Sequence, residues 1–371
     1  MFVVLKHYLS DNNLIIELGG DYQVLSTAAY PKTYDVIRYV VFNKVTKYLR
    51  LDEVKSYCTD LIRSLGLDLS RTSVFLTAAE VSRYTHTVKD VDSVRVEVFM
   101  TLGIDWISCL DSVVNIYNVE DLKLSTINVA VFVSKPLDNV GLLDLFRLVS
   151  EVKGSLMTLL GPTCTTTPSI GTPSDATLVA SPLGSERYLD MSSGLGRVVT
   201  SALTEAIVGR LRELPLDDYV RYVLGGISIE ELHKISMEVY SRCRIPNKED
   251  SKVGSEILNE LLNTLKDPNI LALLRGTRFI EFILALGMVS GLSINEYLND
   301  SPGIIVDELI GKALAEYVNG FKGLLSYYWV ERLKKSGEVK ELLRLPPITD
   351  DLVTALVGAV LSRVYDRYSR V

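Results

Sequence analysis

The chain of 371 residues contains 47% hydrophobic and 23% charged residues and has a formal net charge of −7, a composition typical of folded rather than disordered proteins. Its length is sufficient for two or three domains with sizeable cores. Because no basic stripe is present that could neutralise phosphates, the sequence argues against nucleic acid as a partner.

The mean hydropathy is +0.22, but the longest apolar stretches, residues 279–292 and 352–360, are shorter than the ~20 residues that a spanning helix needs. We therefore expect no membrane span. No secretory signal pattern opens the chain, and its four cysteines form no Cys-x-x-Cys motif, which predicts free thiols in a reducing compartment. We expect a cytoplasmic protein, and a homo-oligomer is compatible with the sequence.

Up to about residue 214, short β-rich runs alternate with helical patterns, which predicts an α/β or α+β domain with a mixed sheet over residues 1–214. The expected strands lie at residues 14–16, 74–76, 94–100, 127–133 and 176–180, and the expected helices at residues 33–48, 51–64, 140–160 and 194–214. From residue 215 onwards the pattern is helical almost throughout, which predicts an all-α helical domain over residues 215–371. Its helices are expected at residues 216–224, 228–241, 252–266, 269–286, 304–321 and 350–368.

A long hydroxyl-rich segment, residues 161–175, ends with Asp175 directly before an expected strand. Long loops of this kind inside compact domains are often functional, although their Ser and Thr side chains can also serve only to hydrogen-bond the local backbone. Asp175 would be held at the edge of the sheet, where it is a candidate base, nucleophile or ligand.

Six sequence blocks follow one another along the first domain: Leu25-Ser26-Thr27-Ala28, Leu76-Thr77-Ala78-Ala79, Phe99-Met100-Thr101-Leu102-Gly103, Ser125-Thr126-Ile127-Asn128, Ser150-Glu151-Val152-Lys153 and Gly171-Thr172-Pro173-Ser174-Asp175-Ala176. In this collinear order, over roughly residues 20–213, they resemble the adenosylcobinamide amidohydrolase family. The family cleaves the amide that joins cobyric acid to aminopropanol in a salvaged corrinoid. The resemblance implies a corrinoid substrate for the first domain and no firm cofactor.

Amide hydrolysis needs an attacking group, a base and donors for the developing oxyanion, and no Ser-His-Asp or Cys-His set is recognisable in the sequence. On the matching blocks we expect catalytic roles for Asp175 and Glu151, and substrate contacts from Thr101, Gly103, Asn128, Lys153, Thr172 and Ser174.

Glu151 and Lys153 lie two residues apart on an expected helix, so their side chains diverge by ~200° and only one of them faces a common site. Glu151 could instead pair with Arg147 on a solvated face. Asn128 lies on an expected strand, and its polar side chain requires a partner that is either structural or the substrate.

The chain departs from the family pattern at several positions. Tyr30-Pro31-Lys32 stands where the family has Asn-Gly-Gly, the family's Gly-x-x-Asn-Ala motif appears as Gly103-Ile104-Asp105-Trp106-Ile107, and Pro173 interrupts a threonine-rich motif. These changes keep open a non-catalytic, corrinoid-binding role for the first domain.

The second domain carries two adjacent acid pairs, Asp307-Glu308 and Asp350-Asp351, each after a helix-start signal and before apolar residues. Oxygen-only ligands suit a hard cation such as Mg2+. Acids in a first helical turn also complement the helix macrodipole, and this alternative suits the second pair, which follows Thr349 as a possible N-cap. It suits the first pair less well, because acids in apolar surroundings are costly unless paired or metal-bound.

Both pairs resemble the acidic motifs of the phosphatidylglycerophosphatase A superfamily, in particular its soluble α-ribazole-5'-phosphate phosphatases, over about residues 228–368. The resemblance implies Mg2+ ligands at Asp307, Glu308, Asp350 and Asp351, catalytic roles for Asp307 and Asp350, and phosphate contacts from Arg278, Arg332 and Lys334. The superfamily's aspartate near this lysine is replaced by Glu331, and a neighbouring arginine is absent.

The two implied reactions serve the same coenzyme, so we predict a bifunctional hydrolase of cobalamin biosynthesis and corrinoid salvage with small-molecule substrates. It would release aminopropanol from adenosylcobinamide and dephosphorylate α-ribazole-5'-phosphate to α-ribazole. A phosphatase that acts on phosphatidylglycerophosphate is an alternative, which the missing spanning helix disfavours.

Overall fold

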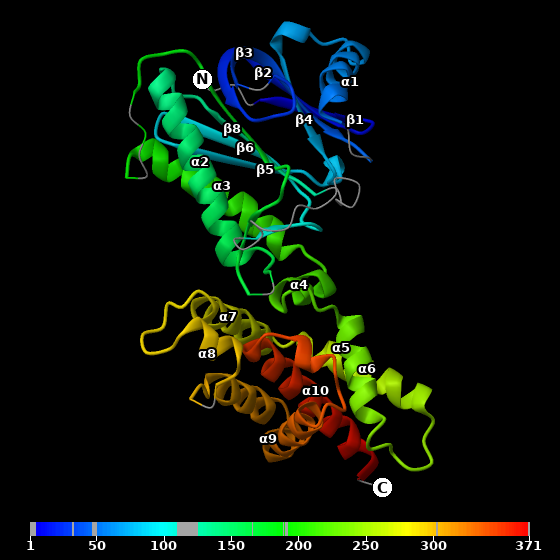
Figure 1. The fold of residues 1–371 in the computed structure, drawn as a ribbon. Coiled ribbons are helices and arrows are strands. Elements are labelled where there is room, and N and C mark those ends of the chain that lie inside the picture. The colour runs from blue at the N-terminus through cyan, green and yellow to red at the C-terminus, as the bar shows by residue number, and fades with distance from the viewer. Residues whose placement is uncertain are drawn as a thin grey trace. The chain divides into compact units, whose positions relative to one another are not determined.

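The computed structural model describes residues 5–31, 33–46, 50–109, 125–164, 166–187, 189, 192–301 and 303–369. The chain forms two compact units (Figure 1), the first comprising Met1–Gly161 and Ser169–Glu213 and the second comprising Pro162–Pro168 and Leu214–Val371. Lys32 and Thr165, which belong to segments named above, and Pro302, which belongs to the helix-start signal before Asp307-Glu308, lie outside the described residues.

The first unit is built on a mixed sheet of eight strands, which confirms the predicted fold class. The strands are β1 (Lys6–Ser10), β2 (Asn13–Ser26), β3 (Thr33–Lys44), β4 (Thr72–Thr77), β5 (Thr85–Val91), β6 (Val94–Leu102), β8 (Ile127–Val133) and β10 (Ala176–Ser181). Their order is β4-β3-β2-β10-β8-β6-β5, with β1 paired to β2. The β3–β4 and β8–β10 pairs are parallel, and a separate pair joins β7 (Ser108–Cys109) to β9 (Ser169–Gly171).

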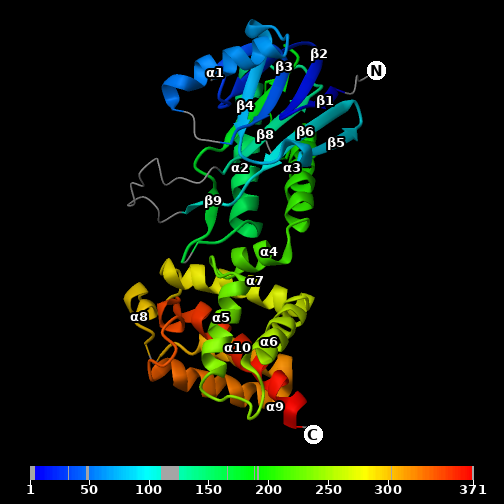
Figure 2. The same ribbon diagram turned by 90° about the vertical axis from the view of Figure 1, so that its right-hand side faces the viewer.

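Alternate residues of β2 contribute to two hydrophobic cores, because successive side chains of a strand point to opposite faces. Leu14 and Ile16 belong to a core that collects side chains from β2, β3, β4, β6, β8 and β10. Ile15 belongs to the core beneath α1 (Leu51–Ser64). Two further helices, α2 (Asn139–Leu160) and α3 (Gly194–Arg212), pack against each other (Figure 2). Helix α2 also packs against β10, and α3 packs against β5 and β6.

The helix predicted at residues 33–48 is wrong, because this segment forms β3. Its run from Val36 to Phe42 is rich in β-branched and aromatic residues, which fit a pleated surface. The strand pairs with both β2 and β4, so hydrogen bonding to two neighbours outweighs the helical spacing of its apolar residues.

The second unit is helical, as predicted. Its helices are α4 (Leu216–Val223), α5 (Ile229–Tyr240), α6 (Asp250–Leu265), α7 (Pro268–Ala285), α8 (Ile294–Leu298), α9 (Val306–Lys335) and α10 (Pro347–Ser369). They enclose one large core in which α10 contributes buried residues along most of its length. The last helix begins three residues earlier than expected, so Thr349 lies within its first turn and is not an N-cap.

Helix α9 is a helical hairpin rather than one straight helix. Its backbone is non-helical at Asn319 and Gly320, and Gly320 has a φ of 55°. A Cβ placed on Gly323 would lie 2.2 Å from the carbonyl oxygen of Ala315, so the two halves of α9 cross at close range. The half after Gly320 was not among the predicted helices.

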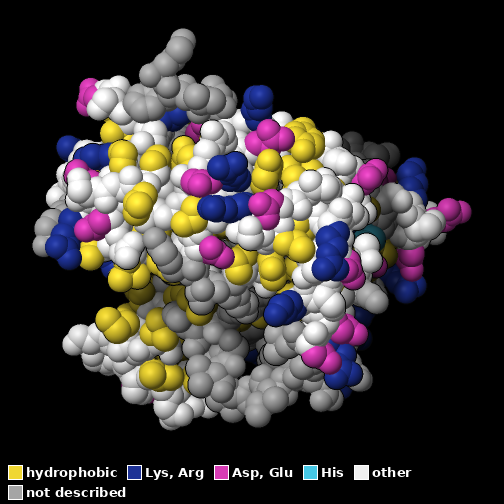
Figure 3. All heavy atoms as spheres, turned by 90° about the horizontal axis from the view of Figure 1, so that it is seen from above, with side chains coloured by type: hydrophobic (Ala, Val, Ile, Leu, Met, Phe, Trp, Pro, Cys, Tyr) yellow, Lys and Arg dark blue, Asp and Glu magenta, His cyan; other side chains and the backbone are white. Residues whose placement is uncertain are grey.

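Among the described residues, none of the helices combines the length and the hydropathy that a membrane span requires. Cys58 and Cys243 are free thiols, whereas Cys109 and Cys164 are disulfide-bonded, so the prediction of four free thiols is wrong for two of them. On the face drawn in Figure 3, basic and acidic side chains are interspersed and no continuous basic stripe is visible.

Candidate functional sites

In the first unit, a partly buried ion pair lies where β8 and β10 begin. The parallel register places Ala176 beside Asn128, so Asp175 lies next to the start of β8. One oxygen of Asp175 accepts hydrogen bonds from the backbone N of Ile127 at 2.8 Å and from the Thr172 hydroxyl. The other accepts from Lys153 Nζ at 3.0 Å. Lys153 is 9% exposed, and its charge compensates that of the carboxylate.

Gly171 makes room for this carboxylate. Its φ is 136°, a conformation that favours glycine, and a Cβ at this position would lie 2.4 Å from Asp175 Oδ2. Any other residue would therefore displace the oxygen that contacts Lys153.

Polar side chains from three neighbouring elements extend the cluster. The Thr126 hydroxyl lies 2.8 Å from the carbonyl oxygen of Ser174 and 3.1 Å from Asn128 Oδ1. Asn128 donates from Nδ2 to the carbonyl oxygen of Leu76 at 2.9 Å. Asn128 is also the register partner of Thr101 on β6. Asn128 is fully buried, and the carbonyl oxygen of Leu76 is a structural partner for its amide. Of the two predicted alternatives, a structural partner or the substrate, the structure shows the first.

The structure thus brings most of the predicted site residues of the first domain together. The members are Thr101, Asn128, Lys153, Thr172, Ser174 and Asp175, with Gly103 joined through its backbone N to the carbonyl oxygen of Thr126. Sequence reasoning missed Thr126 and also Thr77, whose hydroxyl accepts from Thr101 at 3.2 Å. Both lie in blocks that carry the family resemblance, but neither has a spacing that marks a role.

Glu151 is not brought to this cluster. Its carboxylate is exposed and pairs with Arg147 Nη1 at 2.9 Å, one helical turn away. Glu151 and Lys153 lie two residues apart on α2, and their side chains point in different directions, as helical geometry predicts. Lys153 is the residue that faces Asp175.

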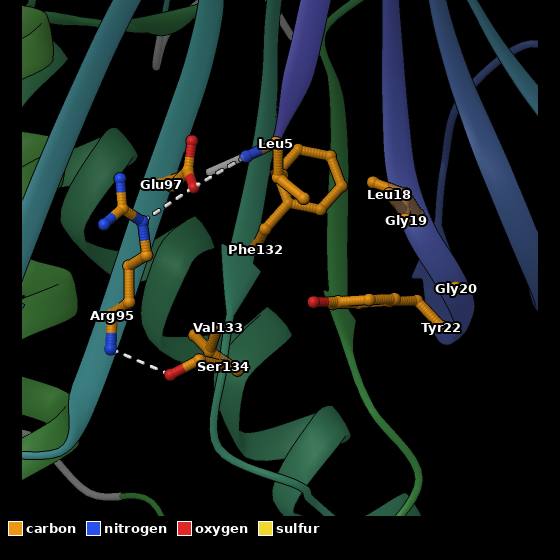
Figure 4. A pocket seen from close by; sticks show the side chains of 10 residues that line it. All are labelled: Leu5, Leu18, Gly19, Gly20, Tyr22, Arg95, Glu97, Phe132, Val133 and Ser134. Carbon is orange, nitrogen blue, oxygen red and sulfur yellow. Dashed lines mark hydrogen bonds and ion pairs between the residues drawn. The ribbon is translucent and has the colours of Figure 1, made fainter. Parts of the chain in front are cut away.

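A cavity of about 250 Å3 lies at the other end of β8. It is lined by Leu5, Leu18, Gly19, Gly20, Tyr22, Arg95, Glu97, Phe132, Val133 and Ser134 (Figure 4). Figure 4 shows Tyr22 extending its ring from β2 towards β8, and Glu97 accepting from Arg95 Nε at 2.8 Å and from the backbone N of Leu5 at 3.2 Å. The cavity is smaller than the ~300–1,000 Å3 of pockets for drug-sized ligands, so it does not fit a whole corrinoid.

In the second unit, the hairpin of α9 and the start of α10 bring five acids together. The acids form two groups, Asp307-Glu308-Asp351 and Glu331-Asp350-Asp351, which share Asp351, and within each group one oxygen per residue lies within 4.8 Å of the others. Tyr327, on the returning half of α9, donates to Asp351 Oδ2 at 2.9 Å. The four predicted acids are therefore close in space, and Glu331 joins them.

Lys334 partly compensates the negative charge of the second of these groups. Its Nζ lies 2.8 Å from Glu331 Oε2 and 3.0 Å from Asp351 Oδ1, and it also contacts Asp350. Burial alone would lower the pKa of Lys334, but Asp350 and Asp351 raise it well above its usual value. The lysine is therefore a fixed cation among carboxylates rather than a side chain free to reach a phosphate.

The first group, which we call the acid triad (Asp307, Glu308 and Asp351), is less completely hydrogen-bonded than the second. Burial, assisted by Glu308, raises the pKa of Asp307 to about 8. Within the described part of the chain, Glu308 Oε2 is buried and has no hydrogen-bond partner. Carboxylate oxygens in this arrangement are the donor set that a hard divalent cation takes, so the residues fit Mg2+.

Arg278 and Arg332 occupy different surroundings from those expected. Arg278 is 1% exposed and donates to Glu281, to the Thr349 hydroxyl and to the carbonyl oxygen of Cys164. It therefore holds Thr349, the residue before Asp350, instead of facing an open site. Arg332 is exposed on α9 and belongs to neither acid group.

Residues 4–213 match the family model described as adenosylcobinamide amidohydrolase (CbiZ). Because the match spans more than half of the chain, the protein belongs to the adenosylcobinamide amidohydrolase family. This membership supports a hydrolase of cobalamin salvage with a corrinoid substrate. The match ends at residue 213 and does not extend into the helices of the second unit.

Other similarities are more distant. The uncharacterized protein MJ1330 of Methanocaldococcus jannaschii is 29% identical over 121 residues, which cover 32% of this chain and 91% of that protein. The low temperature requirement C protein of Listeria monocytogenes matches 42% of this chain and 99% of its own with 17% identity and a TM-score of 0.35. The protein ypjQ of Bacillus subtilis matches 42% and 99% with 18% identity and a TM-score of 0.34. At these TM-scores the two solved structures define neither fold nor function for this chain.

Proposed function

We propose that the first unit hydrolyses the amide between cobyric acid and aminopropanol in adenosylcobinamide, at the partly buried Lys153–Asp175 pair. Family membership supports the reaction. The observation that supports this location is the pair itself, a lysine and an aspartate 3.0 Å apart and surrounded by the hydroxyls and the amide of the matching sequence blocks.

The chemistry assigns a role to each member of the pair. Asp175 accepts a proton from the attacking water, whose oxygen forms the new bond to the amide carbon. The C–N bond breaks, the nitrogen of aminopropanol takes the proton, and cobyric acid leaves as the carboxylic acid. Lys153 holds the carboxylate of Asp175 in position through their ion pair and provides a positive charge for the oxygen that becomes negative in the transition state.

The direct test is the release of aminopropanol from adenosylcobinamide by the purified full chain. We expect Asp175→Asn to lower kcat/KM by at least ~100-fold, the loss typical of removing a general base. Protein that retains the corrinoid but releases no aminopropanol would instead support the non-catalytic corrinoid-binding role.

For the second unit we propose Mg2+-dependent dephosphorylation of α-ribazole-5'-phosphate. The observation that supports this proposal is the acid triad, in which Glu308 has a buried oxygen without a hydrogen-bond partner among the described residues. A phosphomonoester is an anion that bare carboxylates repel, so a phosphatase built on these acids needs a bound cation.

Asp307, Glu308 and Asp351 would hold Mg2+, which when bound inverts the local charge and polarises phosphoryl oxygens. Lys334 fixes Asp350 and Asp351 at the start of α10. Tyr327 and Arg278 position the same turn, through Asp351 and Thr349 respectively. These contacts preorganise the carboxylates before any ligand binds.

The test is phosphate release from α-ribazole-5'-phosphate, with phosphatidylglycerophosphate in detergent as the competing substrate. We expect activity with the ribazole phosphate that depends on Mg2+ and falls at least ~100-fold in Asp307→Asn. A preference for the lipid phosphate would favour the alternative lipid phosphatase, and activity unchanged by Asp307→Asn would contradict the assigned site.

A further inference from the structure

The cavity at the end of β8, which we call the β8 cavity, is used by neither of the proposed reactions. It lies roughly 20 Å from the Lys153–Asp175 pair, because β8 has seven residues and each rises ~3.3 Å. Its volume is about 250 Å3. A cavity of ~150 Å3 can hold a benzene ring, so this one has room for a small ring that carries a polar group.

A long irregularity in β2 shapes one wall of the β8 cavity. From Glu17 to Tyr22 the strand advances by five residues while its partner β3 advances by two, from Tyr39 to Ile37. Gly19, within this bulge, lines the cavity and has a φ of 69°, a conformation that favours glycine. Bulges redirect side chains and are frequent beside functional sites. The strand resumes its pairing at Tyr22, whose ring extends across the cavity towards β8 (Figure 4).

The hydroxyl of Tyr22 is a hydrogen-bonding group that the protein leaves open. Within the described part of the chain it has no hydrogen-bond partner, although a tyrosine hydroxyl that is largely removed from water usually has one. Burial and, to a smaller extent, the negative charge of Glu97 raise the pKa of Tyr22 above its usual value. The hydroxyl is therefore protonated at neutral pH and can donate to a ligand.

Ser134 and Glu97 add a second donor and an acceptor to the wall. The Ser134 hydroxyl accepts from the backbone N of Arg95 at 2.8 Å, and no described residue accepts its proton. Glu97 Oε1 accepts from Arg95 and from Leu5, whereas Oε2 has only His86 Nε2 as a partner among the described residues, at 2.9 Å. A carboxylate oxygen can accept a second hydrogen bond, so Oε2 has capacity left.

The charges around the β8 cavity favour a neutral ligand. Arg95 is paired with both Glu97 and Asp90, so these three side chains together carry one excess negative charge. A carboxylate ligand would be repelled. An ammonium ligand would lose its water for a carboxylate that Arg95 already compensates, and such desolvation is costly.

We propose that the β8 cavity binds a small neutral molecule that combines an apolar body with a primary carboxamide. The carboxamide oxygen accepts from Tyr22 and Ser134, and its NH2 group donates to Glu97, which uses both functions of an amide. The apolar body packs against Leu5 and Phe132, which are 5% and 2% exposed. A ligand without an NH2 group would leave the free capacity of Glu97 unused.

Isothermal titration calorimetry on the full chain tests this assignment with benzamide, benzoate and benzylamine, from about 10 µM to 10 mM. The three probes share one ring and differ in charge. We expect benzamide to bind with a dissociation constant below about 1 mM, and benzoate and benzylamine to bind at least ~10-fold more weakly.

Tyr22→Phe should weaken benzamide at least ~5-fold, because one hydrogen bond to the ligand is lost. It should leave the melting temperature of the free protein unchanged, since the hydroxyl has no partner within the described part of the chain. Tyr8→Phe is the matched control, because Tyr8 is 44% exposed on β1 and lies outside the β8 cavity. The control should keep the dissociation constant within about twofold of the wild type.

The proposal is overturned if benzamide does not bind up to about 10 mM, if benzoate or benzylamine binds as tightly, or if Tyr22→Phe leaves the affinity unchanged. A lower melting temperature in Tyr22→Phe would show that the hydroxyl has a structural partner, which also overturns it. Binding is measured without turnover, so its failure is distinguishable from that of the proposed reactions.

Discussion

Lys153 and Glu151 lie two residues apart on α2 and have opposite environments. Lys153 is buried against Asp175, whereas Glu151 is exposed and pairs with Arg147. This contrast provides a matched pair of substitutions within one helical turn, in which one change removes a buried charge and the other alters a solvated ion pair of small energetic effect.

We predict that Lys153→Met lowers kcat/KM for aminopropanol release by at least ~100-fold, because the transition-state oxygen loses its cationic partner. Glu151→Gln should leave kcat/KM within about twofold of the wild type. Steady-state kinetics on both variants, with thermal melting to show that each is folded, check the expectation. Equal losses in the two variants would contradict the assigned site.

Glu97, at the cavity of Figure 4, couples the stability of the first unit to acid. Burial alone would raise the pKa of Glu97, but hydrogen bonds from His86, Arg95 and the backbone N of Leu5 outweigh burial and hold the pKa below its usual value of 4.5. Because the carboxyl pKa is lower in the folded than in the unfolded state, its stabilising contribution is present above pH 4.5 and is lost as the pH falls through the folded-state pKa.

We therefore predict that the melting temperature falls as the pH is lowered below this value, and that Glu97→Gln shows a weaker fall. At neutral pH the same substitution should cost roughly 1–3 kcal/mol, because charge-assisted hydrogen bonds to a buried group are lost. Differential scanning calorimetry of both proteins between about pH 3 and 7 measures the difference. Parallel curves for the two proteins would show that Glu97 does not carry the effect.

At the scale of single residues, sequence reasoning found side chains but not their partners. Asp175 and Lys153 were both identified, yet their ion pair depends on a helix and a strand that meet only in the fold. The acids at 307, 308, 350 and 351 were recognised as pairs. Glu331 joins them because α9 turns back at Gly320, which no local periodicity indicates.

At the scale of elements, the hairpin of α9 depends on glycine at the crossing. We predict that Gly323→Ala destabilises the protein by roughly 1–3 kcal/mol, the usual cost of overpacking, because its Cβ would lie 2.2 Å from the carbonyl oxygen of Ala315. Gly276→Ala is the matched control, since Gly276 is inside α7 and a Cβ added there would meet no described atom within 4 Å. Alanine should stabilise that helix by up to ~1 kcal/mol. Chemical denaturation of the two variants distinguishes them, and similar free energies of unfolding would contradict the close crossing.

Many strands and helices were predictable from apolar spacing, but β1, β5, α8 and the second half of α9 were not expected, and β3 was expected to be a helix. Val36, Val40 and Val41 occur at intervals that fit a helix as well as a strand, and the choice is decided by pairing with β2 and β4. Such non-local hydrogen bonding is absent from any short sequence window, so β propensity was the better indicator here.

At the scale of the whole molecule, the chain enters the second unit once before the predicted boundary at residue 214 and then returns to the first unit. Pro162–Pro168 belongs to the second unit, where the Thr163 backbone N donates to the carbonyl oxygen of Tyr222 at 3.1 Å and the carbonyl oxygen of Cys164 accepts from Arg278. A hydroxyl-rich loop has no periodicity that reveals this placement. A fragment that begins at residue 214 would lack these partners, so the two activities are better separated by substitution in the full chain.

The two proposed reactions should therefore respond independently to metal removal. The first site has Lys153 as its own cation, whereas in the acid triad only Asp351 is paired with a lysine within the described part of the chain. We predict that EDTA lowers phosphate release at least ~100-fold and leaves aminopropanol release within about twofold of its value without EDTA. Added Mg2+ should restore phosphate release. Asp307→Asn should reproduce the effect of EDTA, and Asp175→Asn should give the opposite pattern. Both products can be measured from one preparation supplied with both substrates. If EDTA lowers aminopropanol release as strongly as phosphate release, the first site also needs a metal and the role assigned to Lys153 is wrong.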